Sequence, residues 1–231
     1  MPDTDTKYQN IMNRLRALAD SRATAGMQQF GINTESALGI SMPALRELAR
    51  EIGKDHALAD QLWEAGIHES RILACLIDNP REVTERQMDR WVSDFNSWDL
   101  CDQCCGNLFD KTKFAYSKAL EWSGRDEEFV KRAGFAMMAS LAVHDKRADD
   151  DAFEPFFPRI ISEAADDRNY VKKAVNWALR QIGKRNRALH KRAIAVAKEL
   201  QEIDSPAARW IASDALRELT SNKVQQRLRS R

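Results

Sequence analysis

Apolar side chains recur at intervals of three and four residues along nearly the whole chain, which is the spacing of one face of an α-helix. Ile11, Leu15 and Leu18, for example, would share one face of the first helix. No stretch alternates apolar and polar residues as a half-buried strand does, so the chain is predicted to be all-α. The predicted helices cover residues 5–20, 23–30, 41–53, 55–65, 68–78, 84–94, a run beginning after Asn96 or Ser97, and residues 110–122, 126–143, 151–164, 168–184, 187–200 and 205–219.

Several of these helices begin at residues that favour helix ends. Ser41 is a predicted N-cap, and Pro43 then falls in the first turn, where its missing N–H costs nothing. Thr84 begins a capping box that Gln87 completes. Residues 31–40 contain turn formers and little periodicity, which predicts a surface loop.

Three of the later helices resemble one another in register. Their matching segments begin at Val130, Val171 and Ala208, at spacings of 41 and 37 residues. Two helices per roughly 40 residues is the period of HEAT-type repeats, which stack into a curved solenoid with a concave face. No Pro-rich or Gly/Ser-rich linker interrupts the chain. The prediction is therefore one HEAT-like repeat domain over residues 1–231.

Charge is distributed unevenly along the chain, although the formal net charge is only +1. Residues 1–167 carry 20 basic and 30 acidic side chains, a net charge of −10, whereas residues 168–231 carry 16 and 5, a net of +11. A basic C-terminal third on an acidic body is typical of a polyanion-binding face. The alternative is that these are ordinary basic helices facing solvent.

The four cysteines include Cys101 and Cys104, which have CxxC spacing. A metal or redox pair would have this spacing, but no second CxxC and no nearby histidine completes a ligand set. We interpret the cysteines as buried thiols that fill the core. The four histidines are scattered, so neither a metal nor a cofactor is expected.

Two tryptophans stand beside charged residues in patterns that suggest chemistry. Trp98 and Asp102 are four residues apart, so they would share a helix face, and a carboxylate inside an apolar helix needs a reason to be there. Trp177 stands near a set of cations that suits contacts to sugars and phosphates: Lys172, Lys173, Arg180, Lys184 and Arg185. The alternative for Trp177 is a place in the core. Trp63, Trp91, Trp122 and Trp210 are interpreted as core or inter-helix packing.

The first six residues are polar and acidic, and no apolar run approaches the roughly 18 residues that a membrane-spanning helix needs. We expect a cytoplasmic protein, associated with the nucleoid if it is bacterial. We also expect a monomer that does not contact membranes.

The chain resembles the DNA alkylation repair family of HEAT-like repeat proteins, the AlkD-type alkylpurine DNA glycosylases. The resemblance spans about residues 8–200. Four stretches in a fixed order carry it: Gly39-Ile40-Ser41-Met42-Pro43, Ser97-Trp98-Asp99-Leu100-Cys101-Asp102, Phe129-Val130-Lys131-Arg132, and residues 170–180 with Trp177-Ala178-Leu179-Arg180.

The resemblance implies that Asp102 matches the catalytic carboxylate and that Trp98 and Trp177 match the indoles beside the lesion sugar. Arg132, or alternatively Lys131, would match an arginine that contacts the DNA backbone, and Arg180 would match another. The implied activity is hydrolysis of the N-glycosidic bond of cationic N3- or N7-alkylated purines in double-stranded DNA, without base flipping. The alternatives are a non-catalytic protein that binds damaged or branched DNA, and a protein-interaction scaffold.

Overall fold

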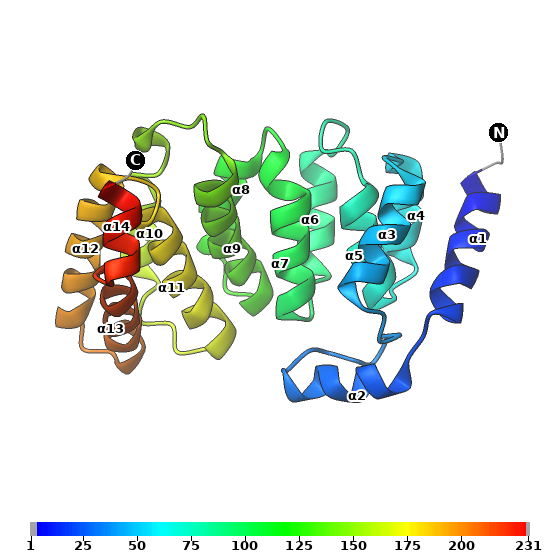
Figure 1. Cartoon of the computed structure of the whole chain (residues 1–231), viewed down its shortest axis with the longest axis horizontal. Helices are drawn as coiled ribbons and strands as arrows, with labels where there is room; N and C mark the ends of the chain where they lie inside the picture. Colours follow the sequence, from blue (N-terminus) through cyan, green and yellow to red (C-terminus); the bar gives the residue numbers. More distant parts are fainter. Residues whose placement is uncertain (1–3, 230–231) are drawn as a thin grey trace. The chain divides into compact units, whose positions relative to one another are not determined.

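The computed structural model describes residues 4–229, and every regular element in that range is helical (Figure 1). The α-helices are α1 (Thr4–Ala17), α2 (Ser21–Gln29), α3 (Met42–Ile52), α4 (His56–Glu64), α5 (His68–Ile77), α6 (Glu85–Ser93), α7 (Trp98–Asn107), α8 (Ala115–Ser123), α9 (Glu128–His144), α10 (Phe156–Ser162), α11 (Asn169–Gly183), α12 (Arg187–Glu202), α13 (Pro206–Leu219) and α14 (Asn222–Arg229). Two 3₁₀ turns, η1 (Phe109–Lys111) and η2 (Asp150–Ala152), precede α8 and α10. The prediction of an all-α chain is confirmed.

Side-chain caps fix the beginnings of several helices. The carboxylate of Asp55 accepts the backbone N–H of Leu58 in α4, and the hydroxyl of Thr84 accepts that of Gln87 in α6. Each bond satisfies one of the N–H groups that a helix start leaves without a helical partner. The Gln87 side chain turns away and donates to Asp78, so only half of the predicted capping box forms.

The described contacts divide the chain into two compact units, residues 1–113 and 114–231. In the first unit α5 packs against α3, α4 and α7. The indoles of Trp63 and Trp91 stack in its core with ring centroids 4.0 Å apart, which joins α4 to α6. The prediction of a single domain stays a prediction.

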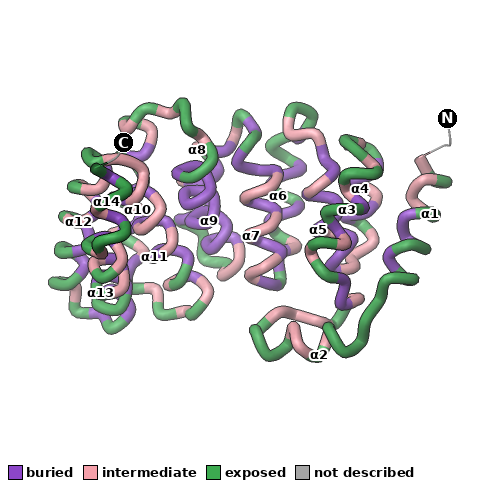
Figure 2. Tube along the Cα trace, viewed as in Figure 1, coloured by how far each residue is buried: buried purple, intermediate pink, exposed green. Residues whose placement is uncertain are grey.

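The second unit is built from two layers of helices. Helices α9, α11 and α13 are neighbours in one layer, and α8, α10 and α12 are neighbours in the other. Residues 130–142 of α9 are all buried, as Figure 2 shows, because α8 and α11 cover the helix on two sides. Gly134 permits the close approach of α8, since a Cβ there would lie 2.3 Å from the Ser123 nitrogen.

Most of the predicted helices match observed ones, and the exceptions have local causes. The helix predicted over residues 110–122 begins as η1 and restarts at Ala115, and the one predicted over 151–164 forms only at Phe156 after η2. Helix α14 was not predicted. The prediction of buried thiols is confirmed for all four cysteines. Trp63, Trp91 and Trp122 are in the core, whereas 42% of Trp210 is exposed and its indole lies against Lys172 of α11, so Trp210 makes an inter-helix contact and is not a core residue.

Candidate nucleic-acid interface

Helix α7 presents Trp98 and Asp102 one turn apart on a half-buried face. The opposite side of the helix, with Leu100, Cys101 and Cys104, is fully buried. The i, i+4 spacing places Trp98 and Asp102 on the same face of α7, as the sequence predicted. The buried side fixes the rotation of α7, and therefore the direction in which the half-buried pair faces.

A second set of contacts holds the beginning of α7. The Ser97 hydroxyl donates to one oxygen of Asp99, and Nε2 of His68 lies 2.9 Å from the other. Burial alone would raise the pKa of Asp99, but the hydrogen bond and charge of His68 hold it below its ordinary value. The Nε1 of Trp98 donates to the carbonyl oxygen of Phe30 at 3.0 Å. His68 and Asp99 therefore set the place from which Trp98 and Asp102 project.

The neighbouring residue on α5, Glu69, holds the loop before α3. Its buried carboxylate accepts the backbone N–H groups of Leu38, Gly39 and Ile40 at 2.7–3.2 Å. Gly39 has a φ of +78°, and a Cβ there would lie 2.1 Å from the Asp20 carbonyl oxygen, so only glycine fits. The positive φ and the close packing explain why glycine begins the first stretch that resembles the family, Gly39-Ile40-Ser41-Met42-Pro43.

In the second unit, Lys131 and Arg132 lie on α9 and are both buried. The Nζ of Lys131 lies 2.7 Å from Glu163 and 3.3 Å from Asp166. Burial opposes its charge, but these carboxylates raise the pKa of Lys131 above its ordinary value. The Nη1 of Arg132 donates to the Tyr170 carbonyl oxygen at 2.7 Å.

Helix α11 carries a row of candidate residues at helical spacing. Lys173 is exposed, whereas Trp177, Arg180 and Lys184 are half-buried. The Arg180 guanidinium and the Lys184 ammonium share one carboxylate, that of Glu218 on α13, at 2.5 and 2.6 Å. These two predicted DNA-binding cations are therefore already in ion pairs within the unit.

The remaining α11 candidates have different surroundings. The Arg185 guanidinium donates to the carbonyl oxygens of Ala142 and Ala148 and lies 4.5 Å from the Phe153 ring centroid. It therefore ties the loop after α9 to the end of α11. The Lys172 ammonium lies 5.3 Å from the ring centroid of Trp210.

Trp210 is a candidate that the sequence interpretation missed. Its half-exposed indole is paired with a cation on the neighbouring helix α11, a combination that suits contact with a sugar or base. The signal was present in the register, since Trp210 occupies the third position of its repeat segment, between Arg209 and Ile211.

No group of three or more His, Cys, Asp and Glu side chains among residues 4–229 is arranged to hold a metal ion. None of the described helices is both long and apolar enough to cross a membrane.

Comparisons with known proteins add the family. Among solved structures, the chain is similar to a protein from "a new family of proteins related to the HEAT-like repeat DNA glycosylases with affinity for branched DNA structures", with a TM-score of 0.73 and 22% identity over 91% of this chain and 94% of that one. A designed armadillo repeat protein in complex with a (KR)4 peptide is less similar, at 15% identity over 81% and 80% of the two chains and a TM-score of 0.37. No curated protein sequence matches the chain. The sequence model of the DNA alkylation repair enzyme family matches residues 11–219, and the chain therefore belongs to that family.

Proposed function

We propose that the protein is a monofunctional DNA glycosylase that releases cationic N3- or N7-alkylated purines from double-stranded DNA. The observation that carries this proposal is the half-buried face of α7, where Trp98 and Asp102 stand one turn apart. The buried His68–Asp99 pair holds the beginning of that helix. Membership of the DNA alkylation repair enzyme family supports the same conclusion.

A single carboxylate suffices for this chemistry. Most glycosidases need a second one to protonate the leaving group. An N3- or N7-alkylated purine already carries a positive charge, so the C1′–N bond breaks with its electron pair leaving on a neutral base. Asp102 stabilises the positive charge that develops at C1′ and orients the water whose oxygen bonds to C1′, and that water's proton passes to the carboxylate or to solvent.

The tryptophan faces assist the same step. An indole ring attracts a cation placed over its face, so Trp98 favours the cationic sugar of the transition state. Trp98 and Asp102 are both partly exposed on the same face of α7, which suits a lesion that is approached without base flipping. In the second unit, Trp177 and the exposed Lys173 on α11 are candidates for contacts with DNA. Arg180 and Lys184 are further candidates, provided that phosphates displace Glu218 from them.

Arg132, or alternatively Lys131, is the candidate on α9 for the contact with the DNA backbone. Lys131 lies against two carboxylates, which a phosphate would have to replace at an electrostatic cost.

The test is single-turnover release of 7-methylguanine or 3-methyladenine from methylated duplex DNA. Asp102→Asn should abolish release while leaving affinity for the duplex nearly unchanged, because it removes the charge but keeps the shape. Glu47→Gln is the matched control, since Glu47 is an exposed carboxylate on α3 in the same unit. Equal release by the Asp102→Asn variant and the parent protein would refute the assignment.

The second candidate is a non-catalytic protein that binds branched DNA, which is the affinity attributed to the relative with a TM-score of 0.73. It predicts tight binding of a four-way junction and no release of any alkylated base by the parent protein. A protein-interaction scaffold predicts little salt-dependent affinity for DNA of either form.

A further inference from the structure

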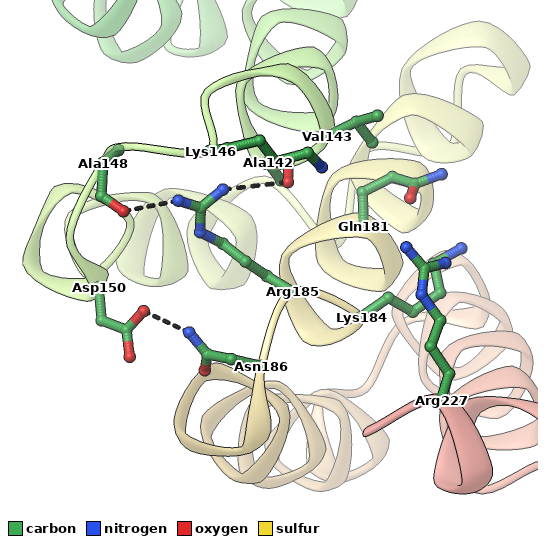
Figure 3. A pocket seen from close by; sticks show the side chains of 10 residues that line it. All are labelled: Ala142, Val143, Lys146, Ala148, Asp150, Gln181, Lys184, Arg185, Asn186 and Arg227. Carbon is green, nitrogen blue, oxygen red and sulfur yellow. Dashed lines mark hydrogen bonds between the residues drawn. The ribbon is translucent and has the colours of Figure 1, made fainter. Parts of the chain in front are cut away.

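A pocket of about 280 Å³ lies in the second unit, where α9 and α11 end and α14 passes (Figure 3). Three segments of that unit line it: the end of α9 with the loop that follows, the end of α11, and α14. The lining residues are Ala142, Val143, Lys146, Ala148, Asp150, Gln181, Lys184, Arg185, Asn186 and Arg227.

The lining is strongly basic. It contains four cations, Lys146, Lys184, Arg185 and Arg227, but only one carboxylate, that of Asp150. A cation near a helix C-terminus is ordinary, because that end carries a partial charge of about −0.5. The C-terminal ends of α9 and α11 together carry a partial charge of about −1, which balances about one of the four cations.

Two of the polar groups are held in place by neighbouring backbone or side chains. The Arg185 guanidinium is oriented by the carbonyl oxygens of Ala142 and Ala148, and the Asn186 amide donates to Asp150 at 2.6 Å, as Figure 3 shows. Lys184 also contacts Glu218, which is not one of the lining residues. A tetrahedral anion with several acceptor oxygens matches such a set of charged donors.

The pocket continues the row of candidate residues on α11. Lys173, Trp177, Arg180 and Lys184 follow one another at i, i+4, i+7 and i+11, so they share one face of the helix. That row is about 16 Å long at 1.5 Å per residue. A DNA strand that followed this row would pass from Lys173 to Lys184 and so reach the pocket.

Helix α14, which supplies Arg227 to this pocket, is held in place by apolar packing and by hydrogen bonds. Val224 and Leu228 are buried, and Arg187 at the start of α12 donates to the Leu228 carbonyl oxygen at 3.0 Å. Gln225 donates to the Leu219 carbonyl oxygen at 2.9 Å. The match to the family's sequence model ends at residue 219, so α14 lies outside the matched residues.

We propose that this pocket binds a phosphate group of the DNA backbone and that α14 extends the DNA contact surface of this chain. The proposal rests on the proposed function only in taking duplex DNA as the ligand. Base release is not required for it.

The test compares Arg227→Gln with Arg229→Gln. Both residues are exposed and both substitutions remove one positive charge from α14, but only Arg227 lines the pocket. Binding of a fluorescent undamaged duplex is measured by anisotropy between 50 and 200 mM salt. One lost phosphate contact should make the slope of log K against log salt about 0.9 less steep, which is a change of about 3.5-fold over that range. Arg229→Gln should keep the parental slope.

A second variant, Lys146→Gln, tests the same pocket from the loop after α9. It should reduce the slope by a similar amount, which keeps the proposal open to refutation if Arg227→Gln perturbs α14. Parental slopes for both pocket variants would overturn the proposal. Calorimetric titration with inorganic phosphate separates the other source of this chemistry. Phosphate binding that Arg227→Gln abolishes, together with an unchanged DNA slope, would identify a site for a free phosphate compound and overturn the DNA assignment.

Failure of the glycosylase proposal would look different. If the parent protein releases no alkylated base but the pocket variants show reduced slopes, the phosphate pocket stands and the glycosylase assignment falls. If base release is normal and the slopes are parental, the opposite holds.

Discussion

Glu218 holds two candidate DNA-binding cations, so removing its charge should strengthen DNA binding. Its oxygens lie 2.5 Å from Nη1 of Arg180 and 2.6 Å from Nζ of Lys184. Burial opposes its ionisation, but Lys184 and Arg180 hold the pKa of Glu218 below its ordinary value of 4.5. Glu218 is therefore charged at neutral pH, and Glu218→Gln removes one full negative charge.

The size of the effect depends on which ion pairs Arg180 and Lys184 keep after the substitution. Asp214 remains 3.4 Å from Arg180 after the substitution, whereas Lys184 loses its described ion pair. About one additional phosphate contact should therefore form. One contact steepens the slope of log K against log salt by about 0.9, so the variant should lose about 3.5-fold more affinity than the parent between 50 and 200 mM salt.

The assay is fluorescence anisotropy of a labelled duplex at several salt concentrations. Glu199→Gln is the control, because Glu199 is an exposed carboxylate on α12 with the same charge. Glu218→Gln should bind more tightly than this control at 50 mM salt, and thermal unfolding followed by circular dichroism checks that both are folded. Weaker binding by a folded Glu218→Gln variant would refute the reasoning, because it would mean that the carboxylate positions the cations and does not compete with phosphates.

Two further predictions concern the first unit. The pKa of Asp99 is lowered, so its contribution to stability is complete above its ordinary value of 3.8 and is lost as the pH falls below that value. Asp99→Asn should therefore lower the Tm at neutral pH and make the fall of Tm at acid pH less steep. An unchanged fall of Tm at acid pH would contradict this. Burial raises the pKa of the Cys104 and Cys105 thiols well above their ordinary value. Ellman's reagent should therefore label neither thiol in the native protein and both after denaturation. Rapid labelling of the native protein would contradict the packing of α7.

Local rules were enough to predict most of the helices. Thr84 caps α6 and Pro206 begins α13 because each preference concerns only the neighbouring backbone. The pairing of Trp98 with Asp102 was predictable in the same way, from helical spacing alone. The stretches that resemble the family then indicated α7, α9 and α11 as the helices with candidate functional residues.

Ion pairs between neighbouring repeats could not be predicted from these local rules. Lys131 meets Glu163, and Arg180 meets Glu218, at separations of 32 and 38 residues. Such pairs depend on how neighbouring helices are rotated and shifted, which packing decides. A cation in a basic segment therefore looked like a phosphate ligand whether or not a carboxylate of the next repeat already lay beside it.

The two carboxylates at the start of α7 show how packing separates roles that the sequence leaves equal. Asp99 and Asp102 are both acidic, and both lie within one turn of Trp98. The oxygens of Asp99 contact Ser97 and His68, which is buried, so that carboxylate is committed to holding the helix. Asp102 shares the half-buried face of Trp98. Loss of Asp99 should therefore act through the position of α7 and be seen in stability, whereas the proposed function expects loss of the Asp102 charge to be seen in the rate of base release.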